Sequence, residues 1–156
     1  MIDVARGMAW LHAIGLIHKD LKPENVVLTG DRQHAKLGNF GLTKHYLRRD
    51  LMEDERLSPY EVRSLYYTAP ECLLTNEFTC AADVYSFGIM LHSCFVTFDG
   101  KRTYDARRIL GHHNPADFLY AFQDAVVHRH ERPIIPESAS SFAGKCQLLF
   151  AKQSVC

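Results

Sequence analysis

The stretch "HKDLKPEN", residues 18–25, is the segment on which the interpretation of this sequence depends. It places an acid, a lysine and an amide close together, at Asp20, Lys22 and Asn25. Phosphoryl transfer needs an acceptor for the proton of the attacking hydroxyl, a cation near the transferred phosphate, and oxygen ligands for magnesium. Because the stretch lacks helical periodicity, we expect a loop that presents the three side chains toward one cavity.

Short elements of regular structure are predicted on both sides of this loop. A helix before it is indicated by apolar residues at helical spacing, Val4, Met8 and Leu11, with Ala5 and Trp10 widening the stripe. Gly15 supplies a left-handed stop. After the loop, "VVL" (residues 26–28) and "AKL" (residues 35–37) are β-type runs joined by the turn-rich "TGDRQ", which predicts a small hairpin.

The second half of the chain is predicted to be largely helical after a long polar loop at residues 42–66. Pro70 opens a short helix in "APECLL". Residues 81–95 are apolar nearly all round, which marks a helix buried on every side. Residues 115–128 are predicted as a surface helix, residues 131–138 as an extended linker, and residues 140–156 as weakly helical.

Composition narrows the classes of protein that fit. The chain has 156 residues, enough to bury a core in one domain, with a net charge of zero. We therefore expect no nucleic acid and no membrane among its partners. The five cysteines are odd in number and lack C-x-x-C spacing, so we expect reduced thiols. No apolar run or signal pattern suggests a membrane or secretory segment, and a cytoplasmic location is the default expectation.

Three further motifs follow the loop in order: N-F-G at residues 39–41, A-P-E at residues 69–71 and "DVYSFG" at residues 83–88. Together the four motifs resemble the protein kinase superfamily, whose members carry H-R-D-L-x-x-x-N, D-F-G, A-P-E and D-V-W-S-F-G. The "KPE" within the loop is typical of serine/threonine kinases. The segment "ARGMAWLH" (residues 5–12) is weakly reminiscent of the tyrosine-kinase-like group.

The resemblance implies a role for each matching residue. Asp20 matches the catalytic base, Lys22 the lysine that meets the transferred phosphate, and Asn25 a magnesium ligand. Ser64 lies where the family has a threonine that bonds the base and the lysine. With ATP and Mg²⁺ as the expected cofactors, the nucleotide-contacting positions are Lys22, Asn25, Val27 and Asn39, and the magnesium positions are Asn25 and Asn39.

Five more residues are implied to have structural roles. Asp83 would accept backbone N–H bonds from the catalytic loop, although a helix N-cap is the alternative interpretation. His18 and Phe40 would pack in the interior, and Gly41 completes the N-F-G motif. Glu71 would pair with an arginine in the closing helices of the family, which we do not find in this sequence.

The first departure from the family pattern is Asn39, which replaces a magnesium-binding aspartate but matters less than the lobe that we do not find in this sequence. At ~2.1 Å and an effective dielectric constant near ~20, the lost charge–charge attraction is about 8 kcal/mol before desolvation. If about 3 kcal/mol survives, the rate or metal affinity falls roughly 150-fold. We therefore expect impairment rather than abolition.

A second departure is Lys19, which stands where the family has arginine. Lysine offers a point charge in place of a planar fork, so a phosphate on the long loop would be held more weakly. The alternative is that Lys19 merely faces solvent.

The sequence predicts a mainly α fold with a small β-hairpin, a kinase-like C-terminal lobe truncated at both ends. Residues 1–156 are expected to form one partial kinase domain without the N-terminal lobe or the final helices of the C-terminal lobe. We expect this chain alone to be inactive. Three interpretations stay open: part of a serine/threonine kinase that acts on a protein substrate, a pseudokinase-type module that binds a regulatory protein, or a degenerate copy without function.

Overall fold

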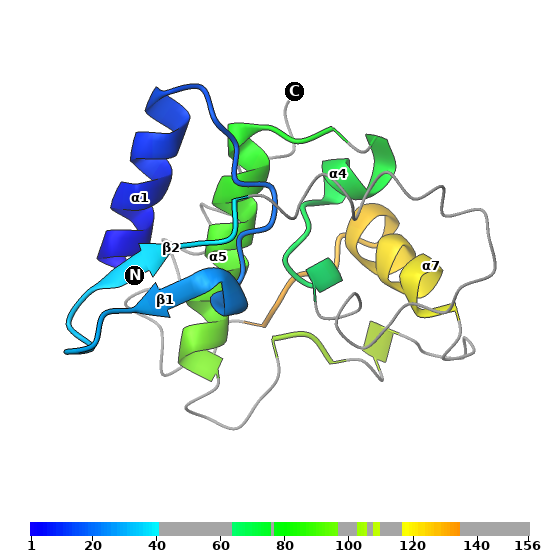
Figure 1. Cartoon of the computed structure of the whole chain (residues 1–156). Helices are drawn as coiled ribbons and strands as arrows, with labels where there is room; N and C mark the ends of the chain where they lie inside the picture. Colours follow the sequence, from blue (N-terminus) through cyan, green and yellow to red (C-terminus); the bar gives the residue numbers. More distant parts are fainter. Residues whose placement is uncertain (41–63, 76, 97–102, 106–107, 110–116, 135–156) are drawn as a thin grey trace.

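The computed structural model describes residues 1–40, 64–75, 77–96, 103–105, 108–109 and 117–134. Within these residues the chain is mostly helical, with one two-stranded antiparallel sheet (Figure 1). The elements are α1 (Ile2–Ala13), the 3₁₀ turn η1 (Pro23–Asn25), β1 (Val26–Leu28), β2 (Ala35–Leu37), α4 (Pro70–Thr75), α5 (Cys80–Val96), α7 (Phe118–Gln123) and the π-helical turn η4 (Asp124–His128). The predicted combination of helices with a small hairpin is confirmed.

Helix α1 buries one narrow stripe and ends in a defined cap. Val4, Met8 and Leu11 are buried, as their spacing predicted. Trp10, by contrast, is 64% exposed, so the prediction that it widens the buried stripe is wrong. Ala5 is exposed as well. Gly15 adopts a φ of +77°, and the neighbouring N–H groups donate back into the last turn, which is the left-handed stop predicted for this glycine.

The hairpin packs beside α1. Its register pairs Val26 with Leu37 and Leu28 with Ala35, and the two strands coincide with the predicted runs "VVL" and "AKL". The backbone N–H of Ala35 donates to Asp3 Oδ2 at 3.1 Å, which ties β2 to the first turn of α1. The hairpin is thereby held on one side of the molecule (Figure 1).

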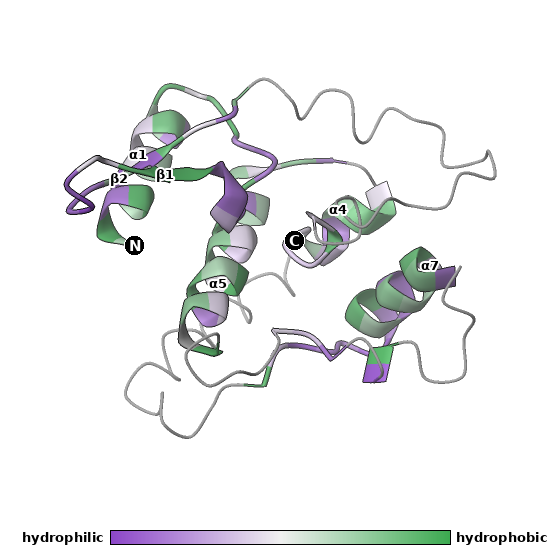
Figure 2. Cartoon of the chain, turned by 60° about the horizontal axis from the view of Figure 1, so that its bottom comes forward, coloured by the Kyte–Doolittle hydropathy of each residue, from purple (hydrophilic) through white to green (hydrophobic). Residues whose placement is uncertain are grey.

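Helix α5 stands between two groups of elements (Figure 1). Met90 packs with Val4, Met8 and Leu21 in a cluster that also includes partly buried residues of the hairpin. Tyr85 and Ile89 belong to a second cluster, formed with α4, α7 and η4. Hydrophobic residues on several faces of α5 are therefore needed, which explains why its sequence lacks a single polar stripe (Figure 2).

The second cluster is rich in aromatic side chains. Tyr66 lies within ring-contact distance of Tyr104, Phe118 and Phe122. Phe122 is 0% exposed. The segment predicted as a surface helix therefore buries one face in the core, and its outer face is the part that meets solvent, as at Tyr120.

Several predictions fall outside the described residues: Gly41, most of the long loop at residues 42–66, and the tail at residues 140–156. The described part of that loop is residues 64–66, and it begins with a helical turn at Ser64 and Leu65. Within the described part of the chain, Cys72, Cys80 and Cys94 are free thiols. Of the helices described there, none has the length and apolar character to cross a membrane.

Candidate active site

The loop between α1 and β1 is anchored by a buried carboxylate from α5. Asp83 is 1% exposed. Its Oδ2 accepts the backbone N–H of His18 at 2.8 Å, and its Oδ1 accepts that of Lys19 at 2.9 Å. Thr79 Oγ1 accepts the N–H of Ala82 at the start of α5, so the helix cap is Thr79 and the alternative interpretation of Asp83 as an N-cap is wrong.

His12 is a partner of this carboxylate that sequence reasoning missed. Its Nε2 lies 2.9 Å from Asp83 Oδ2, so α1, the loop and α5 meet at one side chain. The sequence carries a weak signal for it, a histidine in the last turn of a helix directly after the buried Leu11. That position does not reveal which distant residue the ring faces.

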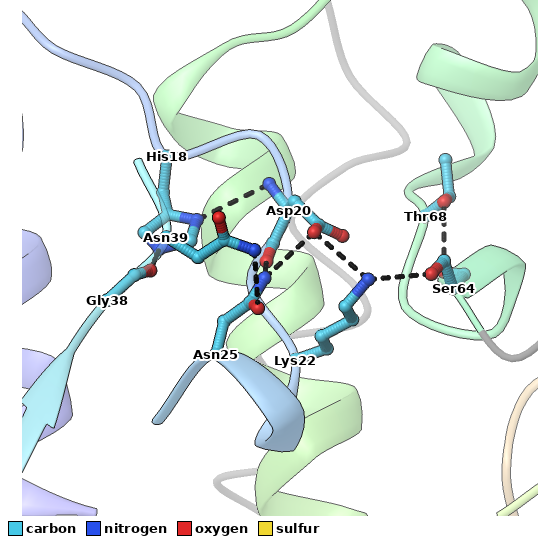
Figure 3. A network of polar contacts seen from close by, with 8 residues as sticks. All are labelled: His18, Asp20, Lys22, Asn25, Gly38, Asn39, Ser64 and Thr68. Carbon is cyan, nitrogen blue, oxygen red and sulfur yellow. Dashed lines mark hydrogen bonds and ion pairs between the residues drawn. The ribbon is translucent and has the colours of Figure 1, made fainter. Parts of the chain in front are cut away.

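The Lys22 ammonium lies between Asp20 and Ser64 and contacts both side chains (Figure 3). Lys22 Nζ lies 3.0 Å from Asp20 Oδ2 and donates to Ser64 Oγ at 2.8 Å. The Lys22 side chain is 3% exposed, whereas that of Asp20 is 20% exposed. The fold thus brings together the predicted base, the predicted phosphate-contacting lysine and a hydroxyl from a segment 42 residues further along the chain than the lysine.

Within the described part of the chain, only one of the two carboxylate oxygens of Asp20 has a polar partner. Asp20 Oδ2 pairs with Lys22 Nζ and accepts a hydrogen bond from the side-chain amide of Asn25 (Figure 3). Asp20 Oδ1 accepts no hydrogen bond from the described residues. An open oxygen on a partly exposed carboxylate can accept the proton of an incoming hydroxyl.

Asn25 and Asn39 contact each other. Asn25 Nδ2 donates to the backbone oxygen of Asp20 at 2.6 Å and to its Oδ2 at 2.8 Å. These two acceptors fix which end of the Asn25 amide faces Asp20, so Asn25 Oδ1 faces Asn39. Asn39 Nδ2 donates to that oxygen at 3.1 Å (Figure 3).

The two asparagines do not fit a magnesium ion as they are arranged. Magnesium requires several oxygen ligands that converge on one point. Here an N–H donor of Asn39 points at the Asn25 oxygen that would face the metal. Among the described residues, no cluster of three or more histidine, cysteine, aspartate or glutamate side chains is placed to hold a metal either.

The end of β2 is positioned by contacts to the loop. Gly38 donates its N–H to the backbone oxygen of Asn25 at 2.8 Å, and its own oxygen lies 3.2 Å from His18 Nε2. Asn39 adopts a φ of +62°, a left-handed conformation that asparagine tolerates better than most residues. Phe40 meets the ring of His18 edge-on at 5.4 Å between centroids. Phe40 is nevertheless 57% exposed, so it is not the core residue that the sequence predicted.

Three other residues singled out from the sequence lie apart from this network. Val27 is 60% exposed on β1. Glu71 is partly buried in the first turn of α4, and no ion pair between described residues includes it. Lys19 has a φ of +69° and an exposed side chain whose ammonium lies 6.0 Å from the centroid of the Phe78 ring.

Comparisons with known proteins relate this chain to protein kinases. The sequence profile of the family described as "protein tyrosine and serine/threonine kinase" matches residues 1–110. The receptor-like kinase TMK2 of Arabidopsis thaliana is 36% identical over 118 residues, covering 69% of this chain and 12% of TMK2. The probable serine/threonine-protein kinase PBL17 of the same plant is 36% identical over 115 residues, covering 72% of this chain and 24% of PBL17.

A third relative, the dual specificity protein kinase shkE of Dictyostelium discoideum, is 31% identical over 138 residues, covering 88% of this chain and 17% of shkE. The chain thus spans less than a quarter of the length of each of these three relatives. The family profile covers well over half of the chain, and it includes the loop, the hairpin, α4 and α5. This chain belongs to the protein tyrosine and serine/threonine kinase family.

Proposed function

We propose that this chain is part of a serine/threonine-type protein kinase domain, corresponding to its C-terminal lobe, and that residues 18–25 form its catalytic loop. The observation that carries the proposal is the position of the Lys22 ammonium, between Asp20 Oδ2 and Ser64 Oγ. A hydroxyl on the segment before A-P-E, held against the lysine, is the arrangement that the resemblance assigns to the serine/threonine type. The name of PBL17, a probable serine/threonine-protein kinase, supports the same substrate class.

In the proposed mechanism, Asp20 is the proton acceptor. A serine or threonine hydroxyl of the protein substrate approaches Asp20 Oδ1, the oxygen that accepts no hydrogen bond from the described residues. As the hydroxyl attacks phosphorus, its proton passes to this oxygen. Asn25 holds the opposite edge of the carboxylate through Oδ2, so the accepting oxygen stays in one orientation.

Lys22 supplies positive charge beside the reacting groups, and Ser64 holds it there. A buried ammonium on a flexible stem needs partners to stay in place, and the two contacts at 3.0 and 2.8 Å provide them. When ATP is bound, its γ-phosphoryl group would pass to the hydroxyl oxygen as the bond to the β-phosphate breaks, and ADP would leave. The expected activity is low, because Asn39 provides neither the charge nor the free oxygen pair of an aspartate.

Phosphate transfer from radiolabelled ATP to serine, threonine and tyrosine peptides tests this proposal. Joined to the N-terminal lobe of a protein kinase, this chain should label serine and threonine peptides slowly, with a loss of about 10²- to 10⁴-fold in Asp20→Asn, which removes the base; the chain alone should not label them. Asp117→Asn makes the same chemical change on an exposed residue away from the loop and should leave the rate unchanged. Equal rates for Asp20→Asn and the unmodified chain would refute the role of Asp20, and labelling of tyrosine alone would refute the substrate class.

A second candidate is a pseudokinase-type module that binds a regulatory protein without catalysis. The contact between Asn39 and Asn25 favours it, because an amide pair satisfies the site without a metal. This candidate predicts no phosphate transfer from the unmodified chain and none after Asn39→Asp. Restoration of transfer by Asn39→Asp, by roughly 10- to 1,000-fold, would instead favour the kinase.

A further inference from the structure

One continuous chain of hydrogen bonds runs through the candidate active site (Figure 3). Asn39 donates to Asn25, and Asn25 donates to Asp20. Asp20 in turn pairs with Lys22, which donates to Ser64. The chain connects the end of β2, the loop and the segment before α4, and each contact is between 2.8 and 3.1 Å.

In this series of hydrogen bonds, the chemistry of each partner determines which group donates and which accepts. Lys22 can only donate, so it fixes Asp20 Oδ2 as an acceptor. The Asn25 amide must turn its nitrogen toward Asp20, which leaves its oxygen for Asn39. Asn39 must therefore present its nitrogen. Position 39 therefore needs a side chain that can donate a hydrogen bond, which asparagine can do and an ionised aspartate cannot.

We infer that the Asn39 side-chain amide takes the place of a divalent cation in this loop, so that the loop is held in its folded arrangement without metal. The N–H group of Asn39 does for Asn25 Oδ1 what a cation would otherwise do, which is to satisfy a partly buried oxygen. The left-handed backbone at position 39, with a φ of +62°, suits asparagine. The resemblance implies that Asn25 and Asn39 are magnesium ligands, whereas the structure shows them hydrogen-bonded to each other. This inference is based on that disagreement.

A carboxylate at position 39 would behave in the opposite way. Asn39→Asp places an acceptor opposite Asn25 Oδ1, at the position now occupied by a donor 3.1 Å away. Two acceptors at that distance repel each other, and a cation between them removes the repulsion by binding both. The substitution should thus convert a loop that is indifferent to metal into one whose stability depends on metal.

Thermal unfolding of the full chain, followed by circular dichroism in EDTA and in millimolar MgCl₂, tests this inference. The unmodified protein should melt at the same temperature in both buffers. In EDTA, Asn39→Asp should melt lower by about 3–8 °C, the size expected when one hydrogen bond is lost in a chain of this length. Magnesium should restore most of this loss.

Gln33→Glu provides the matched control, because it makes the same change from amide to carboxylate on an exposed residue of the same hairpin. It should show no dependence on magnesium. A saturable rise in the melting temperature of the unmodified protein with magnesium, or an Asn39→Asp variant that EDTA does not destabilise, would overturn the inference. The buffers of this experiment contain no nucleotide, so the melting temperatures do not depend on whether the protein transfers phosphate.

A measurement on the unmodified protein decides the question if Asn39→Asp does not fold. Manganese is paramagnetic and broadens the NMR signals of nearby groups. We expect the side-chain amide signals of Asn25 and Asn39 to keep their line widths at stoichiometric Mn²⁺. Selective broadening of these two signals would mean that a cation binds beside the amide pair, and the inference would be wrong.

Discussion

Replacing Asp83 by alanine should destabilise this protein severely, because one buried carboxylate holds two backbone donors and a histidine. The side chain is 1% exposed and accepts N–H groups at 2.8 and 2.9 Å from His18 and Lys19. A buried donor left unsatisfied costs about 1–3 kcal/mol, so two cost about 2–6 kcal/mol. His12 can turn toward water and adds less, since its side chain is 19% exposed. The total is a large part of the ~5–15 kcal/mol that stabilises a typical domain.

Urea unfolding followed by far-UV circular dichroism measures this loss. With a slope of about 2 kcal/mol per molar urea, the midpoint should fall by about 1–3 M in Asp83→Ala. Asp83→Asn keeps one acceptor oxygen, so it should lose about half as much. The control is Asp117→Ala, because Asp117 is exposed and its side chain makes no cap hydrogen bond to α7, and it should change stability by less than about 0.5 kcal/mol.

The reasoning would be refuted if Asp83→Ala unfolded at the same urea concentration as Asp117→Ala. In that case the carboxylate would not anchor the loop to α5. If Asp83→Ala does not fold, Asp83→Asn decides, and an unchanged midpoint for that variant would also reject the anchor.

Two further predictions rest on buried titratable groups. Burial raises the pKa of the Cys72 thiol to about 12. Iodoacetamide at pH 8 should therefore modify the exposed Cys80 and Cys94 well before Cys72, as measured by mass spectrometry. Equal labelling of all three thiols in the folded protein would contradict this. Burial lowers the pKa of His92 below 6.5, so the unfolded chain binds a proton more readily than the folded protein does. The contribution of His92 to the free energy of unfolding should therefore be fully present above about pH 6.5. It should be lost as the pH falls through the lowered pKa. His92→Gln should flatten the dependence of the urea midpoint on pH between about 7 and 5, and parallel curves for the two proteins would reject the role of His92.

Local patterns in the sequence were sufficient for most of the elements. The stripe of Val4, Met8 and Leu11, the two hairpin runs, and the helix opened by Pro70 all occur where their spacing or turn residues predicted. Each of these patterns depends on residues no more than a few positions apart, which is the range over which helical and strand periodicity acts. The exposed Trp10 shows the limit, since periodicity gives a direction around the helix but not the width of the face that a neighbour covers.

The sequence by itself determined the family and which chemical groups stand in the loop: an acid at Asp20, a lysine at Lys22 and amides at Asn25 and Asn39. Only the tertiary structure decided how these groups pair. Asp83 reaches the loop across 64 and 65 residues of sequence because α5 packs between two clusters and carries its first turn beside the end of α1. The direction of the Asn39 amide likewise depends on every other partner in the hydrogen-bond chain. A hydrogen bond between distant residues requires that packing first bring its donor and acceptor within about 3 Å, and no local pattern encodes that distance.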